Sequence, residues 1–445
     1  MQCKKERSFG ALLPAHHSFS NFHRAGFGGD NPMRHIDTEL DAVVVGAGWA
    51  GLAASNALKD AGLRHVVFEK HRLCESWRTQ RWNSFHMNTP NVLTVMPGDR
   101  YVGADPEGYM TRDAFVSMVE NYASSRSLPV ETGTAVTAVR PDSGAFEIVT
   151  SNRTLRACNV VVATGNLNIP KRPTSAGRIP AAITQIDTSD YREHSQLVPG
   201  AVLVIGCGNS GGQIAEDLAI AGRAVYIATG RNGRIPRRYR NRDIVLWLIE
   251  NGRFGQPRTS DTGRPLLGAT HTISLQALSA QGITVLGRFT GVADNGELIF
   301  ANDLRDNVKF GNQVSNNIKA EIDAYIEQNG LSAPGAEMDE AEAVAPRFPE
   351  PPILRLDPVA RGIGTVIWCV GFKGDFSWLN VSGAIDDRGQ PIQKRCISVP
   401  GIYFIGLDSS ETLMAGTILV AEEESRRVAY HILARQAERI GSSQI

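Results

Sequence analysis

The sequence predicts an α/β protein built from two Rossmann-like, three-layer dinucleotide-binding domains, with the second domain inserted into the first. Three observations predict this fold. A β-branched run, a glycine-rich turn and a helix-forming segment follow one another from Asp41 onward. The same order returns from Ala201 onward. Glycine is also in surplus, with 44 of the 445 residues, against a usual share of about 7%.

The composition is that of a globular protein. Apolar residues make up 42% and charged residues 21% of the chain, which excludes disorder of the whole protein. The 46 basic residues balance the 46 acidic residues, whereas nucleic-acid or anionic-membrane binding usually needs a basic excess. No run approaches the roughly 18 apolar residues that span a bilayer. We expect no nucleic-acid partner and no integral membrane segment, and the choice between monomer and homodimer stays open.

The cysteines and the N-terminal segment indicate the compartment. The 6 cysteines stand apart without a C-x-x-C pair, which is typical of a reducing compartment. We therefore expect a cytoplasmic location and neither a zinc ribbon nor a dithiol redox site. Residues 1–36 lack a secretory signal core and favour a disordered extension or a start upstream of Met33, with a weak transit peptide as the third interpretation. His16 and His17 have no partner at ligand spacing, so we expect no metal site.

The first glycine cluster, at Gly46, Gly48 and Gly51, lies between a predicted strand and a predicted helix. The first glycine permits a tight turn, the second lets the backbone approach a pyrophosphate, and the third lets helix and strand pack closely. The N–H groups at the helix start would bind the pyrophosphate. Glu69 ends the next predicted strand, 23 residues after the first glycine, where it would accept hydrogen bonds from ribose hydroxyls. A plain strand–turn–helix is the alternative, and the acid favours dinucleotide binding.

The second cluster contains Gly206, Gly208 and Gly211 and again follows a predicted strand. The next predicted strand ends without an acid, and an arginine run that begins at Arg231 and Arg234 follows it. A carboxylate would repel the 2′-phosphate of NADP, whereas guanidinium groups bind it. We therefore predict an NADPH site with these two arginines nearest the phosphate. A solvated surface segment is the alternative, and it is the favoured interpretation for the outer arginines of the run.

Two dinucleotide motifs in one chain imply a flavin and a nicotinamide that exchange a hydride. Three further segments support this. Val161 to Gly165 contains A-T-G, Glu75 to Arg78 contains a tryptophan, and a late predicted strand from Gly401 ends near an aspartate. With these motifs the chain resembles, as a divergent member, the class B flavoprotein monooxygenases, which include the flavin-containing, Baeyer–Villiger and plant auxin-forming flavin monooxygenases. The resemblance covers residues 40–240 and 362–435.

The resemblance implies FAD in the first domain and NADPH in the second. The implied FAD-binding residues are Gly46, Gly48, Gly51, Glu69, Lys70, Trp77, Arg78, Thr164, Gly165 and Asp408. The implied NADPH-binding residues are Gly206, Gly208, Asn209, Ser210, Gly211, Arg231 and Arg234. Asn88 matches the catalytic asparagine that lies over the flavin in the family and helps to keep the peroxyflavin, and a simple turn is the equal alternative. Arg237 is a second catalytic candidate.

One departure from the family pattern precedes the second glycine motif. Where the family has a glycine, a histidine and then an aromatic residue, this sequence has Ile183, Asp187 and Tyr191. The histidine contributes to the coupling of the two domains in the family. The resemblance therefore implies a divergent branch, and whether the peroxyflavin is stabilised stays open.

The remaining segments complete the expected domain organisation. The sequence predicts a hairpin over 288–300, a helix with an inward face over 314–326, an exposed acidic loop over 334–352 and a C-terminal helix over 417–433. The strand at 364–372 resembles the return into the first domain. We expect an FAD-binding domain in two parts, 37–173 and 353–435, an NADPH-binding domain over 174–352 with the hairpin and the helix, and a tail over 436–445.

The leading hypothesis is an NADPH-dependent FAD monooxygenase. The resemblance implies that NADPH reduces FAD, that O2 adds at the flavin C4a atom, and that this peroxyflavin gives one oxygen atom to a small organic substrate. The main alternative is an FAD-dependent NADPH oxidoreductase that passes electrons to an acceptor without oxygenation. A missing C-x-x-C pair is unfavourable for a disulfide acceptor. A non-catalytic nucleotide sensor is the third hypothesis, and amine, thioether, ketone and aromatic-acid substrates are all open.

Overall fold

The computed structural model describes residues 39–257, 265–409 and 411–442. The segment 1–36, including His16 and His17, lies outside the described residues, and what was predicted for it stays a prediction. The chain from Leu40 onward forms one compact unit. Within the described ranges, no helix has both the length and the apolar character that crossing a bilayer requires.

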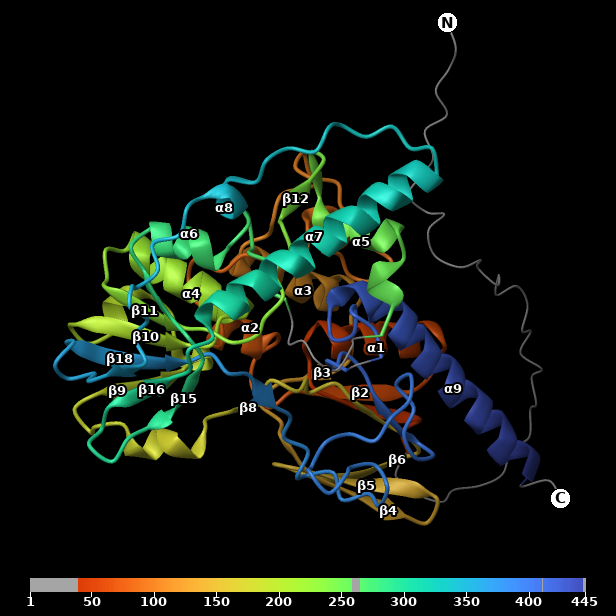
Figure 1. The fold of residues 1–445 in the computed structure, drawn as a ribbon. Helices are drawn as coiled ribbons and strands as arrows, with labels where there is room; N and C mark the ends of the chain where they lie inside the picture. Colours follow the sequence, from red (N-terminus) through yellow and green to blue (C-terminus); the bar gives the residue numbers. More distant parts are fainter. Residues whose placement is uncertain (1–38, 258–264, 410, 443–445) are drawn as a thin grey trace, which may run out of the picture. The chain divides into compact units, whose positions relative to one another are not determined.

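The first domain is built on a parallel five-stranded sheet in the order β20-β7-β1-β2-β3. α1 (Trp49–Asp60), α3 (Arg112–Ser125) and α9 (Ala421–Ser442) cover one face, and a small antiparallel sheet, β4 to β6, covers the other (Figure 1). Because both faces are covered, the strands are continuous apolar runs. The strands are β1 (Ala42–Val45), β2 (His65–Phe68), β3 (Val130–Glu131), β4 (Val136–Asp142), β5 (Ala145–Thr150), β6 (Thr154–Ala157), β7 (Val160–Val162) and β20 (Ile402–Phe404).

The second domain repeats this plan with a parallel sheet in the order β14-β11-β10-β18-β9. α4 (Asn209–Ile220), α6 (Leu275–Ala280) and the start of α7 (Leu304–Gln328) pack on one face, and a small antiparallel sheet, β15 to β17, packs on the other (Figure 1). The strands are β9 (Thr184–Asp187), β10 (Ala201–Ile205), β11 (Val225–Ala228), β14 (Thr284–Leu286), β15 (Phe289–Val292), β16 (Leu298–Phe300), β17 (Arg355–Leu356) and β18 (Ile363–Trp368).

The two sheets correspond strand by strand. β1, β2, β3 and β7 occupy the places that β10, β11, β14 and β18 occupy in the second sheet. The correspondence extends to single contacts: a Cβ on Gly46 would lie 2.7 Å from the backbone oxygen of Ala163, and a Cβ on Gly206 would lie 2.5 Å from that of Cys369. The predicted fold class, two Rossmann-like three-layer domains with one inserted in the other, is confirmed.

The end of the inserted domain differs from the expected boundary at 352/353. β18, which was expected to return the chain to the first domain, pairs with β10 and β9 in the second sheet. The chain crosses between the domains at the neighbouring antiparallel strands β8 (Ile169–Pro170) and β19 (Phe372–Lys373). A fully apolar strand pattern identifies a buried strand but does not say which of two similar sheets accepts it, so the sequence misplaced this one.

The other predicted elements are found with adjusted ends. β15 and β16 form the expected hairpin, and Ile318 and Ile322 are buried on α7 as the periodicity predicted. The remaining helices and strands are α2 (Glu75–Thr79), α5 (Ile244–Glu250), α8 (Glu340–Ala343), β12 (Arg238–Tyr239) and β13 (Arg242–Asp243). Short 3-10 helices lie at Asn91–Leu93, Thr174–Arg178, Thr188–Asp190, His194–Gln196, Arg253–Gly255 and Ile418–Val420.

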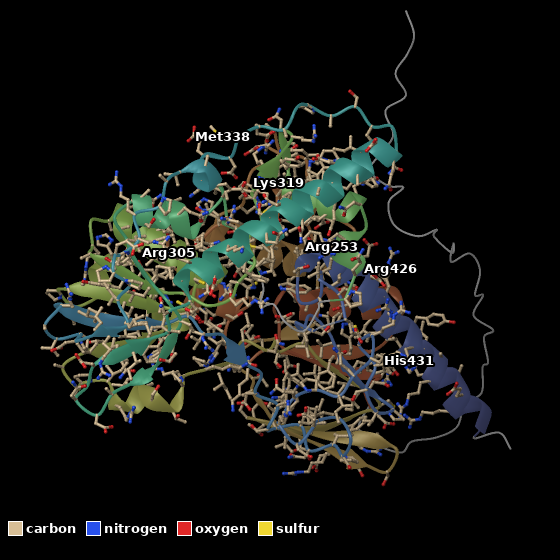
Figure 2. The ribbon with its side chains drawn as sticks, in the orientation of Figure 1. Arg253, Arg305, Lys319, Met338, Arg426 and His431 are labelled. Carbon is tan, nitrogen blue, oxygen red and sulfur yellow. The ribbon has the colours of Figure 1, made fainter. Side chains whose placement is uncertain are left out.

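The C-terminal helix is longer than predicted, because α9 continues to Ser442 through the expected tail at 436–445. Tertiary contacts hold the extra turns: Arg435 donates to the backbone oxygen of Cys158 at 2.8 Å, and Gln436 donates to Asp41 at 2.8 Å. Further back on the helix, His431 (Figure 2) is 3.0 Å from the Tyr403 hydroxyl. These contacts with the first domain keep the last turns of α9 helical, although the polar sequence there predicted a tail.

The acidic segment predicted as an exposed loop is tied down at α8. Glu342 is held by Lys319 of α7 (Figure 2), by the Ser315 hydroxyl and by Arg234. Burial pulls the pKa of Glu342 upward, but the Lys319 and Ser315 hydrogen bonds and the charge of Arg234 together hold it below its ordinary value. Part of the arginine run is thus neutralised by this segment.

Candidate active site

The first glycine turn leaves open space beside Gly48 at the N-terminus of α1. Gly48 caps α1 without a side-chain hydrogen bond, and a Cβ placed on it would meet no atom within 4 Å. Gly46 has a φ of +103°, and a Cβ on Gly51 would lie 1.9 Å from the backbone oxygen of Gly46. The tight positions and the open position are those that pyrophosphate binding requires, since first-turn N–H groups stay available to an anion.

Two polar groups lie close to this turn. Glu69, at the end of β2, accepts from the backbone N–H of Ala47 at 2.9 Å and from that of His71 at 2.9 Å, so its carboxylate lies beside the turn. The Thr164 hydroxyl is buried and has no hydrogen-bond partner in the part of the chain that the structure describes. A buried polar atom without a partner costs about 1–3 kcal/mol unless a ligand or water satisfies it. The residues present therefore fit a bound dinucleotide.

The other residues expected at the FAD site differ in their contacts and in their exposure to solvent. α2 follows Cys74, whose N–H donates to the Ala47 oxygen at 3.1 Å, and its Trp77 packs with a centroid distance of 4.4 Å on Phe115. Arg78 of α2 donates to the Leu73 oxygen and pairs with Glu120, so its charge is already compensated. Lys70 is exposed.

The end of β20 approaches the A-T-G segment. The Asn166 amide donates to the backbone oxygen of Asp408 at 2.9 Å. Gly165, beside it, has a φ of +69° and an open Cβ position. Sequence reasoning did not give Asn166 a role. Its position directly after A-T-G was the available signal, and the contact with Asp408 spans 242 residues.

The second glycine turn has the same backbone but is more covered. Gly206 has a φ of +108°, and the Gly208 cap of α4 again lacks a side-chain hydrogen bond. A Cβ on Gly208 would lie 3.4 Å from the Asn232 amide nitrogen, and Asn209 accepts from the Leu267 N–H at 2.7 Å. Ser210 is half-buried in the first turn of α4. The turn fits a dinucleotide phosphate, with Asn232 and the 265–268 loop close around it.

The two arginines expected at the 2′-phosphate have different surroundings. Arg231 is exposed, with its guanidinium 4.5 Å from the centroid of the Phe310 ring. Arg234 is buried, pairs with Glu342 and donates to Asn312 at 2.7 Å. Arg231 therefore has the accessible charge, whereas the charge of Arg234 is engaged with α8.

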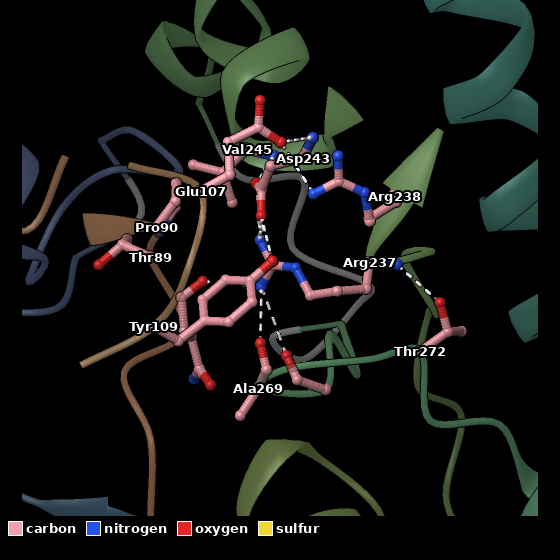
Figure 3. A network of polar contacts seen from close by, with 12 residues as sticks. Thr89, Pro90, Glu107, Tyr109, Arg237, Arg238, Asp243, Val245, Ala269 and Thr272 are labelled. Carbon is pink, nitrogen blue, oxygen red and sulfur yellow. Dashed lines mark hydrogen bonds and ion pairs between the residues drawn. The ribbon is translucent and has the colours of Figure 1, made fainter. Parts of the chain in front are cut away.

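A buried ion pair joins the two domains (Figure 3). Arg237 and Asp243 are 1% and 0% exposed and form two hydrogen bonds of 2.7 and 2.6 Å. From the first domain, the Tyr109 hydroxyl donates to Asp243 at 2.6 Å, and the Asn88 backbone oxygen accepts from Arg237 at 2.8 Å. Burial, with the charge of Asp243, raises the pKa of Tyr109, which keeps it a donor. The pair thus fixes the Asn88 main chain.

The structure brings the two catalytic candidates, Asn88 and Arg237, into contact. The Asn88 side chain also accepts from the Gln213 amide of α4 at 3.1 Å. Sequence reasoning missed Gln213 and Asp243. The signal for Asp243 was its place as the N-cap of α5, where its carboxylate accepts from the Val245 N–H at 2.7 Å. Gln213 left no comparable signal.

The departure from the family pattern is compensated by an ion pair. Asp187, at the family histidine position, accepts two hydrogen bonds of 2.7 and 3.0 Å from Arg172. Ile183, at the glycine position, is buried in the core of the second domain. Tyr191 is buried, and its hydroxyl donates to Asp217 of α4 at 2.5 Å. Asp217 also accepts from Ser84 of the first domain at 2.5 Å, so these residues contribute to domain contact in another way.

Comparisons with known proteins agree with this architecture. The family model described as pyridine nucleotide-disulphide oxidoreductase matches residues 43–249. An uncharacterized CzcO-like oxidoreductase of Geobacillus kaustophilus is 29% identical over 84% of this chain and 92% of that protein. Indole-3-pyruvate monooxygenase YUCCA1 of Oryza sativa subsp. japonica is 32% identical over 40% of this chain and 44% of that protein.

The fold has a solved counterpart as well. A flavin-containing monooxygenase from Stenotrophomonas maltophilia superposes with a TM-score of 0.63 at 17% identity, over 89% of this chain and 99% of that chain. At this identity the likeness shows the fold, while the family is indicated by the sequence relatives and by both glycine turns. The chain is therefore an oxidoreductase, and part of its sequence is similar to flavin monooxygenases.

Proposed function

We propose that the protein is an NADPH-dependent FAD monooxygenase. One atom of O2 enters a small organic substrate, and the other leaves as water: substrate, O2, NADPH and H⁺ give oxygenated substrate, H2O and NADP⁺. The observation that carries the proposal is the 3.1 Å hydrogen bond between Gln213 and Asn88. It joins the helix of the second nucleotide turn to the residue that family resemblance puts over the flavin.

Bound FAD would accept two electrons from NADPH and supply the oxygen chemistry. Glu69, the open turn at Gly48 and the unsatisfied Thr164 hydroxyl support FAD at the first turn. The glycine turn at α4 and the accessible Arg231 support NADPH at the second. In the reaction, the role of the protein would be to hold both cofactors at helix N-termini and to exclude water from the space between them.

Asn88 has a defined part in this proposal. Because Gln213 donates to the Asn88 amide oxygen, the Asn88 amide nitrogen is left to donate to an oxygen of the bound cofactor or substrate. Arg237 acts through Asn88, since its guanidinium is bound to Asp243 and to the Asn88 backbone oxygen. We therefore assign Asn88 as the catalytic residue and Arg237 as a positioning residue.

Three cysteines among the described residues are unfavourable for electron transfer to a disulfide. Cys74, Cys207 and Cys369 are well covered, and burial raises the pKa of each thiol, to about 12, 11 and 12. A thiolate is the reactive form, so these cysteines are inert at neutral pH. Buried reduced thiols are also consistent with a cytoplasmic location, which we propose.

Isotope labelling tests the proposal. Holoenzyme is supplied with NADPH and ¹⁸O2 and with a panel of amines, thioethers, ketones and organic acids. We expect one ¹⁸O atom in one product class, the other in water, and one NADPH consumed per product. NADPH consumption that yields only hydrogen peroxide or a reduced acceptor, with no ¹⁸O in any product, contradicts the proposal.

Replacing Arg231 with Ala tests the NADPH assignment. Its accessible charge is the one available to the 2′-phosphate, so we expect the KM for NADPH to rise on the order of ten- to a hundredfold, and that for NADH to change little. Steady-state kinetics with both nucleotides measure this. Arg288→Ala, at an exposed arginine paired with Asp303, serves as the control. An equal rise in the KM for NADPH and for NADH would contradict binding of the 2′-phosphate by Arg231.

A further inference from the structure

Arg81 is a half-buried arginine that holds no carboxylate among the described residues. Its Nη1 donates to the backbone oxygen of the neighbouring Gln80 at 2.8 Å. Its guanidinium lies 4.8 Å from the centroid of the Trp77 ring and 5.7 Å from that of Phe85. In the described part of the chain, Nε and Nη2 have no hydrogen-bond partner. These two groups form the side edge of the guanidinium, the fork that binds a carboxylate with two parallel hydrogen bonds.

The neighbouring arginines are compensated in a way that Arg81 is not. Arg78 pairs with Glu120, Arg112 with Asp113, and Arg237 with Asp243. A cation that is partly removed from water without a counter-charge is unfavourable, and a protein keeps one where a ligand supplies the anion. The free fork of Arg81 is therefore a candidate anion site.

One further arginine from each domain lies close to Arg81. Arg112 of α3 donates to the Arg81 backbone oxygen at 3.3 Å. Among the described residues, Arg192 of the second domain donates to backbone oxygens only, those of Ser189 at 2.6 Å and Tyr191 at 2.8 Å. Burial and the charge of Arg192 lower the pKa of Arg81 to about 10, so the group stays a cation at neutral pH.

The acidic side chains nearby are turned to other partners. Asp113 accepts from Arg112 at 2.8 Å. Glu193 accepts from Asn83 at 2.9 Å and from the Ser195 hydroxyl. Asp190 accepts from the backbone N–H of Asp187 at 3.4 Å, and its charge acts on Arg192. The site is thus positive at the boundary of the two domains, next to the tryptophan that the proposed FAD site contains.

We propose that the fork of Arg81 binds the carboxylate group of the substrate, so that the enzyme oxidises organic acids rather than amines or neutral ketones and thioethers. The Trp77 and Phe85 rings pack beside the guanidinium, and its Nε and Nη2 edge would bind the ligand. Arg192 adds charge from the second domain, so contact between the domains strengthens the site. That the bound acid is the substrate rests on the monooxygenase proposal, whereas binding of the acid does not require turnover.

Calorimetric titration of the FAD-loaded protein tests this. The probes are phenylacetate and hexanoate, each compared with its neutral amide, which has nearly the same shape. We expect at least one acid to bind on the order of ten- to a hundredfold more tightly than its amide. Arg81→Met, which keeps an apolar stem over Trp77 but loses the charge, should abolish this preference. No preference for either acid in the unaltered protein overturns the proposal.

Two further variants make the result specific. Arg126→Met is the matched control, because Arg126 also stacks on an aromatic ring, 4.0 Å from the centroid of Tyr122, but already pairs with Asp99. It should keep the acid preference. Arg81→Lys, which keeps the charge without the fork, should retain part of it and provides the test if Arg81→Met does not fold.

The absorbance of bound FAD separates the two possible sources of the anion. If Arg81→Met loses FAD while the acid preference survives in the protein that still holds it, the anion is the cofactor phosphate and the proposal is overturned. Failure of the monooxygenase proposal looks different, because ¹⁸O incorporation would be absent while the calorimetric preference for an acid persisted.

Discussion

At the scale of single residues, Arg237 and Asn88 show how a motif-based expectation changes its meaning in the fold. Arg237 was expected beside the reacting atoms, but its guanidinium holds Asp243 and the Asn88 backbone oxygen across the domain boundary. One of its atoms, Nε, is buried without a partner. Gln213 then sets the orientation of the Asn88 amide. Positioning of one asparagine by two residues of the other domain makes its geometry depend on domain contact.

Replacing Gln213 with Leu should loosen the Asn88 amide. Leu has nearly the same volume but no donor, so the amide oxygen loses its partner and the nitrogen is no longer directed. We expect product per NADPH to fall about three- to tenfold and hydrogen peroxide to rise by the matching amount, with the KM for NADPH nearly unchanged. Gln213→Glu, which can accept but not donate when ionised, should behave like Leu. The exposed Gln313→Leu is the control, and an unchanged product ratio in Gln213→Leu would remove the positioning role.

At the scale of elements, α9 contacts the end of β20, which packs against the helix of the first glycine turn. Glu424, in its first turns, accepts from the Gly406 N–H at 2.9 Å at the end of β20. A Cβ on Gly406 would lie 2.4 Å from the Ala50 side chain, so the end of β20 is in close contact with α1. Burial raises the pKa of Glu424 to about 7, and the Gly406 hydrogen bond and the charge of Arg427 oppose this. A carboxyl group of the fold therefore titrates near neutral pH beside the proposed FAD site.

Glu424→Gln should stabilise the protein at alkaline pH. The folded-state pKa lies near 7, above the unfolded value of about 4.3, so the ionised form is unfavourable in the fold. The stability gain of the Gln variant is full above pH 7, shrinks as the pH falls from 7 toward 4.3, and is absent below that. Chemical denaturation at pH 8, 5.5 and 4 measures it. The exposed Glu327→Gln should show no such trend. A gain that is independent of pH would contradict the assignment.

At the scale of the whole molecule, the two domains are joined by side chains rather than by the family histidine. Asp187 pairs with Arg172 of the linking segment, and Asp217 of α4 accepts from Tyr191 and from Ser84 of the first domain. The strands β8 and β19 lie side by side where the chain passes between the domains. Since the nicotinamide and the flavin would be held by different domains, these contacts set how the two cofactors meet.

Asp217→Asn should slow electron transfer from NADPH without unfolding the protein. The carboxylate accepts two hydrogen bonds, and the amide oxygen that replaces it can keep only one partner as well placed. We expect the rate of FAD reduction by NADPH to fall about three- to tenfold in anaerobic stopped flow. Reduction by dithionite, which does not need the second domain, should be unchanged. Asp294→Asn in the exposed hairpin is the control, and equal rates in both variants would show that this contact does not couple the domains.

The local features of the fold were predictable, and the long-range ones were not. Gly46, Gly51 and Gly206 lie in the predicted turns for a local reason, because Gly46 and Gly206 have a positive φ and Gly51 packs directly on the Gly46 backbone. The β15–β16 hairpin and the buried face of α7 were predicted for the same local reason. Gln213 and Arg81 were missed because a polar side chain acquires its meaning from partners far along the chain, and pattern analysis does not see them.

The sequence by itself determined two glycine turns and their strand–turn–helix context. It also showed that an acid ends the strand after the first turn, whereas arginines follow the strand after the second. These are contacts within some thirty residues, where sterics and charge act locally. Only the tertiary structure decided that β18 completes the second sheet, that α8 neutralises Arg234, and that Arg81 lies over Trp77 with no carboxylate partner among the described residues. Each of these depends on which buried surfaces and charges meet after the domains have packed, and that is fixed by the whole chain at once.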